Sequence, residues 1–310
     1  MFGSCTRCSA FRISLVSFIM SSAFLKAVSA AMERIAPLRL AESFDNVGLL
    51  LETPLKQIKR HRVMLTIDLT TAVVDESIAA EASLIVAYHP TIFGALKSFT
   101  LGNPLQASLL RCAAHGISVY CPHTALDCTW GGINDWLAEG VMGGRMAGTV
   151  RPLQTEKFSP TGDSDGALGR LVTLRTPATM EMIEKDMLLT SFYPSLGLMC
   201  AEVQVGYATT NDGRKSSAMV ETIAICAGSG GSVFAGKEAD VYFTGEMQHH
   251  EVLSAIAAGT NVILCGHTNT ERGYLPILAS KLEAQLDAAD YPRPFDVVIS
   301  TTDKHPLEFV

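Results

Sequence analysis

The 310-residue sequence has few charged side chains and no excess of basic ones. Asp, Glu, Lys and Arg together make up 18% of the residues, below the roughly 25% typical of a globular domain. The 24 basic residues are outnumbered by 31 acidic ones, so the formal net charge is −7. Because nucleic-acid binding draws on clustered positive charge, this balance argues against a nucleic-acid partner. It favours small molecules and proteins.

The sequence also lacks a long apolar run and a regular cysteine pattern. The uncharged stretch at residues 13–25 is shorter than the roughly 20 apolar residues that cross a bilayer. The eight Cys are scattered, and some lie inside apolar runs such as 223–227 and 262–265, where a buried thiol behaves as a small hydrophobe. We therefore predict no membrane partner and a reducing compartment.

Acidic residues are absent from the first 32 positions, which carry several serines and three basic residues, Arg7, Arg12 and Lys26. This composition is typical of a mitochondrial transit peptide. We predict a leader over residues 1–19 and a cytoplasmic or mitochondrial location. Two alternatives stay open. One is a secretory signal cleaved near residues 28–30, and the other is translation that effectively begins at Met20.

Beyond this segment, apolar runs rich in Val and Ile alternate with amphipathic stretches. The rhythm predicts an α/β fold with parallel or mixed sheets that are covered by helices. The first set has strands at 63–67, 84–87 and 118–120, with helices at 72–82 and 104–115. The second set has strands at 222–226, 241–243, 262–265 and 297–300, with helices at 248–258 and 274–289.

The two sets predict a two-lobed chain. We place the main α/β lobes at residues 20–148 and 215–310. Between them, residues 149–214 are punctuated by Pro, Gly and Asp and read as a smaller α+β insertion. Its expected elements are strands at 168–174 and 202–207 around a helix at 178–188.

Side chains capable of chemistry follow the ends of four predicted strands. Five of the eight His fall in these short segments. The segments contain His89; His123 with Asp127; Glu246 with His249 and His250; and His267 with Glu271. Open α/β sheets bind ligands at the carboxyl ends of their strands, and imidazole with carboxylate suits zinc, iron, manganese or nickel. The four clusters together predict a metal site.

Two features next to these clusters also bear on the site. Thr270 is expected to cap a helix entered at Glu271, which would keep His267 on the preceding loop. The glycine-rich segment 227–231 is either a tight turn or a backbone contact to a substrate or phosphate. A serine hydrolase built on Ser229 and Asp240 is a further alternative, although Ala occupies position 227, where a nucleophile elbow has Gly.

Six segments, taken in order, resemble the Nif-three family (NGG-one-interacting factor three), also labelled GTP cyclohydrolase type two-like. The resemblance runs from about Met20 to the end of the chain. The segments are 41–49, 88–93, 123–127 with 131–134, 228–231, 239–247 and 266–271. Their order and spacing make the resemblance specific, whereas single segments would not suffice.

The resemblance implies a pair of α/β lobes in a toroidal homohexamer, with a dinuclear metal centre that faces the internal cavity. By motif position, His89 and Asp127 would bind one divalent metal, His267 would bind the other, and Glu271 would bridge both. Many members carry a second His immediately before the one that matches His89. Here Tyr88 takes that place, and a neutral phenol with a pKa of about 10 is a poor ligand. The residues therefore leave occupancy of the second metal site open.

Two hypotheses of function follow. The first is a metal-dependent hydrolase of an unidentified small molecule, in which His123, His249 or His250 would move protons. The second is a non-catalytic metal-binding ring that acts in protein interaction or metal handling. The cyclohydrolase label implies opening of a guanine ring, but the sequence has no recognisable nucleotide-binding motif.

Overall fold

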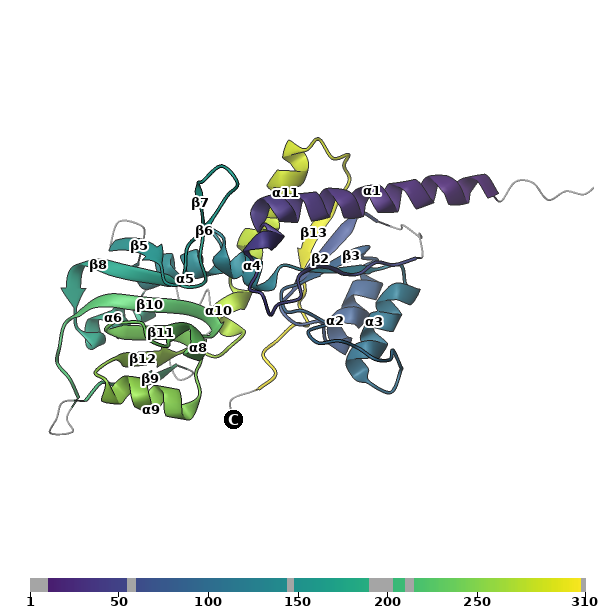
Figure 1. Cartoon of the computed structure of the whole chain (residues 1–310). Helices are drawn as coiled ribbons and strands as arrows, with labels where there is room; N and C mark the ends of the chain where they lie inside the picture. The colour runs from purple at the N-terminus through teal and green to yellow at the C-terminus, as the bar shows by residue number, and fades with distance from the viewer. Residues whose placement is uncertain (1–10, 55–59, 144–147, 190–202, 210–214, 308–310) are drawn as a thin grey trace, which may run out of the picture. The chain divides into compact units, whose positions relative to one another are not determined.

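The computed structural model describes residues 11–54, 60–143, 148–189, 203–209 and 215–307 (Figure 1). The chain divides into two compact units, and each contains its own main sheet. Unit 1 comprises Met1–Ile35, Phe44–Pro122 and Ile277–Lys304. Unit 2 comprises Ala36–Ser43, His123–Pro276 and His305–Val310. Each unit is therefore assembled from segments that are far apart in the sequence.

The sheet of unit 1 has the strand order β1-β4-β3-β2-β13 over the described residues. Its parallel strands are β2 (Arg62–Thr66), β3 (Leu84–Ala87), β4 (Ser118–Cys121) and β13 (Asp296–Ile299). The strands predicted in these regions are confirmed, but the strand at 297–300, which was predicted with the second set, belongs to this sheet. The edge strand β1 (Gly48–Leu51) pairs with β4 in the antiparallel direction, and the sequence did not predict it as a strand.

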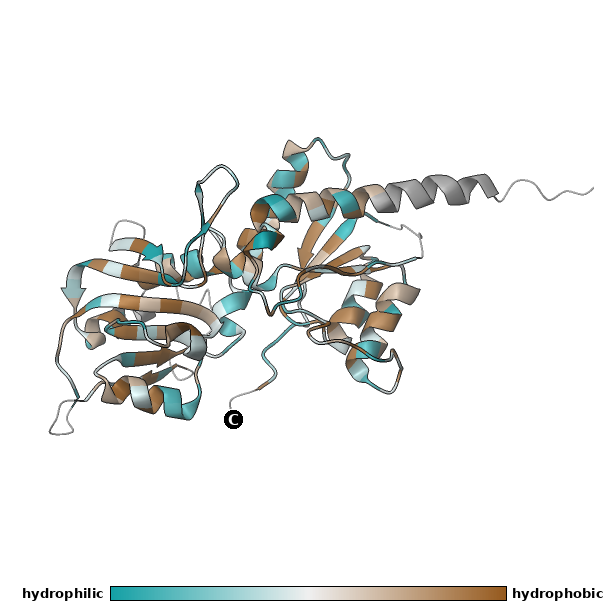
Figure 2. Cartoon of the chain, in the orientation of Figure 1, coloured by the Kyte–Doolittle hydropathy of each residue, from teal (hydrophilic) through white to brown (hydrophobic). Residues whose placement is uncertain are grey.

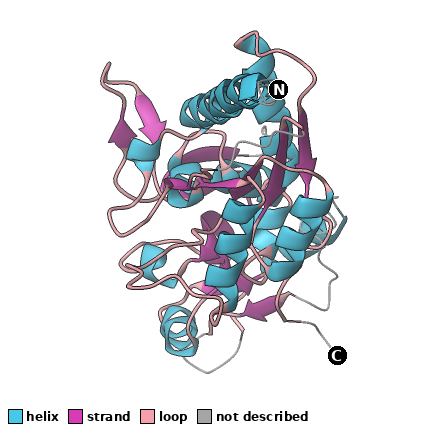
Figure 3. Ribbon diagram, turned by 90° about the vertical axis from the view of Figure 1, so that its right-hand side faces the viewer, coloured by secondary structure: helices cyan, strands magenta, loops and turns pink. Residues whose placement is uncertain are grey.

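Helices α2 (Thr71–Ala79) and α3 (Pro104–Ala114) lie side by side against this sheet (Figure 1, Figure 3). Met64, Ile85 and Val119 of the strands share one buried cluster with Val73 of α2 and Leu109 of α3. Every residue of β3 and β4 is buried. This two-sided burial explains why these strands read as continuous apolar runs (Figure 2).

Helices α1 (Phe11–Ile35) and α11 (Leu275–Ala288) supply further buried side chains of unit 1. Both follow the four-residue spacing of an amphipathic helix: the buried residues include Phe24, Val28 and Met32 in α1 and Leu278, Leu282 and Leu286 in α11. Arg34 Nε donates to Gln285 Oε1 at 2.5 Å. No helix among the described residues is both long enough and apolar enough to cross a membrane.

The sheet of unit 2 is mixed, with the order β5-β8-β10-β11-β12-β9 in the described part of the chain. Its parallel centre consists of β10 (Val220–Ser229), β11 (Val241–Glu246) and β12 (Asn261–Leu264). The antiparallel strands are β5 (Gly148–Pro152), β8 (Arg170–Ala178) and β9 (Gln204–Gly206). These outer strands come from the stretch predicted as an insertion, and they extend the same sheet. The domain boundaries at 148 and 214 stay a prediction.

Shorter elements surround this sheet. Their bounds are η1 (Leu38–Leu40), α4 (His123–Cys128), α5 (Ile133–Val141), β6 (Lys157–Phe158), β7 (Ser164–Gly166), α6 (Met180–Leu189), α8 (Gly231–Phe234), α9 (His249–Ala257) and α10 (Asn269–Arg272). Arg170 on β8 is fully buried, and its guanidinium donates to both carboxylate oxygens of Asp135 on α5 and to the carbonyls of Cys128 and Thr129. These bonds compensate the burial of the charge and join β8 to α4 and α5.

Candidate metal centre

In unit 1, a histidine and a carboxylate follow two neighbouring parallel strands. His89 follows β3, and Asp68 follows β2. The distance from His89 Nδ1 to Asp68 Oδ1 is 2.9 Å. A carboxylate at Nδ1 fixes the orientation of an imidazole and turns Nε2 toward a metal. The sequence analysis found His89 but missed Asp68, whose only signal is its position just after a strand.

Unit 2 contains the same arrangement. Glu246 is the last residue of β11, and His267 follows the parallel neighbour β12. His267 Nδ1 lies 2.9 Å from Glu246 Oε1. In both units the two partners are 21 residues apart in the sequence, because one helix connects the two strands. Glu246 was grouped with His249 and His250 in the sequence analysis, and its actual partner is His267.

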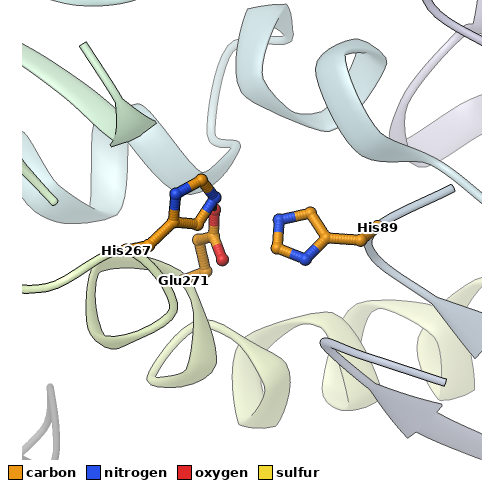
Figure 4. Close-up of side chains that lie close together, drawn as sticks. All are labelled: His89, His267 and Glu271. Atoms are coloured by element: carbon orange, nitrogen blue, oxygen red, sulfur yellow. Dashed lines mark ion pairs between the residues drawn. The ribbon is translucent and has the colours of Figure 1, made fainter. Parts of the chain in front are cut away.

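Glu271 lies beside His267 in unit 2. It is part of the short helix α10, and its side chain is only 2% exposed. His267 Nε2 is 3.4 Å from Glu271 Oε1, a contact between positions four residues apart (Figure 4). A buried carboxylate next to the outward nitrogen of an oriented histidine is a donor pair that suits a divalent cation.

Thr270 has a different role from the one predicted. It lies within α10, and Thr268 holds the position before that helix. The Thr270 hydroxyl donates to the His267 carbonyl at 2.7 Å and accepts from the Gly228 N–H at 2.8 Å. The prediction that Thr270 caps the helix is therefore wrong. Its hydroxyl instead links the glycine-rich segment to the backbone of His267.

Gly228 at the end of β10 packs against both ligand side chains. Its φ is +62°, in the left-handed region that favours glycine. A Cβ at this position would lie 2.8 Å from Glu271 Oε1 and 3.0 Å from His267 Nε2. The glycine is required because its backbone comes so close to the ligand atoms.

Asp127 lies in α4 and is buried. Burial raises the pKa of the Cys226 thiol well above its usual range, and the charges of Asp127 and Glu271 raise it further. Both carboxylates therefore act on the same buried thiol of unit 2. Asn134 joins this region, since its amide donates to the Asp127 carbonyl at 3.0 Å and accepts from the Ala227 N–H at 2.8 Å.

The three histidines predicted to move protons lie at two helix starts. His123 is the first residue of α4, one turn before Asp127, and is half-buried with a φ of +26°. His249 and His250 are exposed in the first turn of α9. Among the residues that the structure describes, the candidate metal ligands do not include these three, and their catalytic roles stay predictions.

Tyr88 occupies the position where many family members would carry a second histidine. Its side chain is buried, and its ring centroid lies 5.1 Å from that of His89. The carbonyl of Tyr88 accepts a hydrogen bond from Cys121 Sγ at 3.0 Å. The residue thus packs as an aromatic core side chain beside His89.

The serine hydrolase alternative is wrong. Asp240 precedes β11, and its Oδ2 accepts from the backbone N–H groups of Glu221 and Thr222 at 2.8 Å each. These residues begin β10, whereas Ser229 ends that strand. At about 3.3 Å per strand residue, Ser229 and Asp240 are roughly 20 Å apart. They do not form a catalytic pair.

His89, His267 and Glu271 are candidate metal ligands among the described residues, and Figure 4 draws their side chains. His89 belongs to unit 1, while His267 and Glu271 belong to unit 2. All three were predicted from the sequence. Two imidazoles and one carboxylate match the preferences of zinc, iron, manganese and nickel.

Comparisons with known proteins identify the family of the chain. A family model described as Duf34/NIF3 (NGG1p interacting factor 3) matches residues 23–306. Protein NIF3 homolog of Schizosaccharomyces pombe is 43% identical over 272 residues, which cover 87% of this chain and 92% of the relative. NGG1-interacting factor 3 of Saccharomyces cerevisiae is 34% identical over 278 residues, with coverages of 86% and 90%.

Solved structures with similar folds include a Bacillus cereus protein related to NIF3. Its TM-score is 0.73 at 20% identity, and the match covers 91% of this chain and 98% of that one. Reduced HcgD from Methanocaldococcus jannaschii has a TM-score of 0.67 at 22% identity, with coverages of 89% and 96%. At these identities the likeness shows a shared α/β fold.

Proposed function

Because the chain belongs to the DUF34/NIF3 family, we propose that it is a metal-dependent hydrolase in which His89, His267 and Glu271 hold a divalent cation. The observation that carries the proposal is the repeated histidine–carboxylate pair, 2.9 Å in both units. Histidines that bind metals commonly donate their second ring nitrogen to a carboxylate. Two such pairs, built on separate sheets, support a shared metal-binding role.

A bound divalent cation would supply Lewis acidity and an activated water at neutral pH. The residues of the chain would supply orientation and charge. Asp68 and Glu246 hold the two imidazoles at Nδ1, so that each Nε2 would be available to the cation. Glu271 contributes a buried negative charge. His123 is the predicted group closest in sequence to Asp127, and we assign it, with His249 and His250 as alternatives, to proton transfer.

We extend the proposal to a second cation, with Asp127 as a ligand next to His89 and with Glu271 as the bridge. The support is the joint effect of Asp127 and Glu271 on Cys226, which places two buried carboxylates in one region of unit 2. A second divalent cation would offset this concentration of negative charge. Tyr88 adds no good ligand, so the second cation is expected to bind more weakly.

We also propose that copies of the chain assemble as the toroidal homohexamer that the family resemblance implies. Unit 1 exposes large apolar side chains, among them Phe44, Phe93 and Leu101, which are 63%, 58% and 74% exposed. The ring centroids of Phe44 and Phe93 lie 6.4 Å apart, and apolar side chains grouped at a surface are typical of protein interfaces. Light scattering coupled to gel filtration would measure the assembly, and a monomer at micromolar concentration would contradict it.

The alternative function is a non-catalytic ring that binds metal for metal handling or protein interaction. The name of the Saccharomyces cerevisiae relative, NGG1-interacting factor 3, favours interaction with a protein for that relative. For this chain, the replacement of a ligand by Tyr88 favours the same alternative, because a site with fewer ligands suits structural metal binding better than catalysis.

The test compares Asp68→Asn, Glu246→Gln and wild type for metal affinity and for hydrolysis of a phosphoester panel with zinc, iron, manganese or nickel. Each variant keeps the shape of the carboxylate and removes its charge, so we expect affinity to fall about 10-fold or more. Asp75→Asn is the control, because Asp75 pairs with Arg111 on the surface of α2 and α3.

Unchanged metal affinity in both Asp68→Asn and Glu246→Gln would contradict the metal site. Tight metal binding by wild type without any turnover would contradict hydrolysis and leave the non-catalytic alternative.

A further inference from the structure

A pocket of about 490 Å³ opens beside His267, and every residue that lines it belongs to unit 2. Its walls come from the ends of β11 and β12, from the edge strand β9, and from the C-terminal residues 305–307. The volume falls within the range of small-molecule sites. Because His267 and its partner Glu246 form part of the wall, a molecule in this pocket would lie next to the candidate metal ligands.

The lining combines apolar faces with a few hydrogen-bonding groups. Met247, Leu264 and Leu307 supply the apolar surface, and Gln204, Asn269 and His305 supply amide and imidazole groups. A thioether packs well against aromatic rings, while side-chain amides pair with the edges of planar heterocycles. These groups suit a flat ring that carries both donors and acceptors.

Two of the polar side chains are oriented by backbone contacts. His305 Nδ1 contacts both the carbonyl and the N–H of Leu307, at 3.0 and 3.1 Å, which leaves Nε2 as the ring nitrogen on the side of Gly266. Asn269 Nδ2 donates to the Cys265 carbonyl at 2.9 Å, which fixes the orientation of the amide. The pocket thus offers an imidazole nitrogen and a side-chain amide in fixed positions.

Positive charge is absent from the lining over the described residues, which includes neither Lys nor Arg, while Glu246 contributes a carboxylate. Phosphate and carboxylate ligands are usually held by Arg, Lys or a helix N-terminus. An anionic group in this pocket would therefore meet a negative charge without compensation.

We propose that the pocket binds an uncharged, planar heteroaromatic ring with an amide-like edge, and that His305 contributes specificity for it. The inference rests on the proposed function, since it assigns the part of the substrate that lies beside the cation. Any anionic part of the same substrate would lie outside this pocket.

The experiment titrates nicotinamide and nicotinate, which differ in charge at the same ring position, into metal-free protein by ligand-observed NMR. We expect saturable binding of nicotinamide with a Kd on the order of millimolar for a ligand of this size. Nicotinate is expected to bind at least about 5-fold more weakly, because it brings a second negative charge into a pocket that already contains Glu246 and has neither Lys nor Arg in its lining. Nicotinate binding equal to or tighter than nicotinamide binding would overturn the inference, and so would a nicotinamide signal that does not saturate.

His305→Ala tests the residue itself. Loss of one hydrogen bond is expected to weaken nicotinamide binding about 5-fold. His115→Ala is the matched control, since His115 is an exposed histidine at the end of α3 in unit 1, and circular dichroism confirms folding of both variants. Equal affinity of His305→Ala and His115→Ala for nicotinamide would overturn the role of His305.

The use of metal-free protein separates the two proposals. Nicotinamide binding without any metal affinity contradicts only the proposed function, and metal affinity without nicotinamide binding contradicts only this inference.

Discussion

The two units contain the same histidine–carboxylate pair but differ in the number of candidate metal ligands. Each places a carboxylate after one parallel strand and a histidine after the next, 21 residues later and 2.9 Å apart. Four residues beyond its histidine, unit 2 has the buried Glu271, whereas unit 1 has Phe93, which is 58% exposed. The comparison teaches that, in the proposed site, unit 2 would supply most of the donor set and unit 1 would contribute one oriented imidazole.

The largest loss of metal affinity is expected from Glu271→Gln. This variant removes the buried charge of unit 2, and we expect metal affinity to fall about 100-fold. His89→Ala removes the single ligand of unit 1, with an expected loss of about 10-fold. Isothermal titration with zinc measures both. If His89→Ala loses more affinity than Glu271→Gln, unit 1 dominates the site and the comparison is reversed.

A smaller effect is expected from Gly228→Ala in unit 2. The substitution forces a left-handed conformation on Ala, at a cost of about 1 kcal/mol in unfolding free energy. It also places a methyl group 2.8 Å from Glu271 Oε1, so metal affinity is expected to fall about 10-fold.

Gly236→Ala is the matched control for this substitution. Gly236 has a similar φ of +71°, and a Cβ there has no neighbour within 4 Å. Urea unfolding and zinc titration of both variants separate the conformational cost from the contact with the ligands. Equal zinc affinity of the two variants would show that the close approach of Gly228 is not needed.

The smallest effect is a pH dependence of the free energy of unfolding, and it comes from Glu76 in unit 1. Burial alone would raise the pKa of Glu76, but hydrogen bonds from Ser300, Thr301 and Thr302 outweigh it and hold the pKa at about 2. Because the folded pKa lies below the ordinary glutamate value of 4.5, the stabilisation of the fold is complete above pH 4.5 and is lost as the pH falls toward 2. After allowance for solvent screening, we expect a contribution of about 1 kcal/mol.

Glu76→Gln measures this contribution. Its unfolding free energy should fall below that of wild type at pH 7, and the gap should narrow between pH 4.5 and 2. Zinc affinity at pH 7 should be unchanged, since Glu76 joins α2 to the residues after β13 and belongs to neither histidine–carboxylate pair. A gap in stability that is constant with pH would show that the hydrogen bonds do not depend on the charge.

Much of the fold and part of the site were predictable from the sequence. Strands buried on both faces read as Val- and Ile-rich runs, and His89 and His267 stand directly after such runs. Asp68 was missed, and Glu246 was grouped with His249 and His250 instead of His267, because a carboxylate at a strand end also looks like an ordinary turn residue. Its partner lies one helix further along the chain, so no local pattern joins the two.

The remaining misses have a similar cause. Asn134 and Thr270 act through backbone groups of distant segments, at Ala227 and Gly228, and side-chain identity alone does not reveal such partners. The edge strand β5 was missed, because it is short and partly exposed and its hydrophobic pattern is weak. The strand at β9 was predicted, but not its place in the second sheet, because it pairs with β12, which is well separated from it in the sequence.

The position of β13 in the first sheet has a consequence for synthesis. This strand pairs with β2, yet Asp296 leaves the ribosome 234 residues after its partner Arg62. Until Asp296–Ile299 emerges, the flank of β2 is an open edge, which is a site where other chains can pair. The sheet of unit 2 has all of its strands once Leu264 is made. Nascent chains stalled before residue 296 should therefore depend most on chaperones.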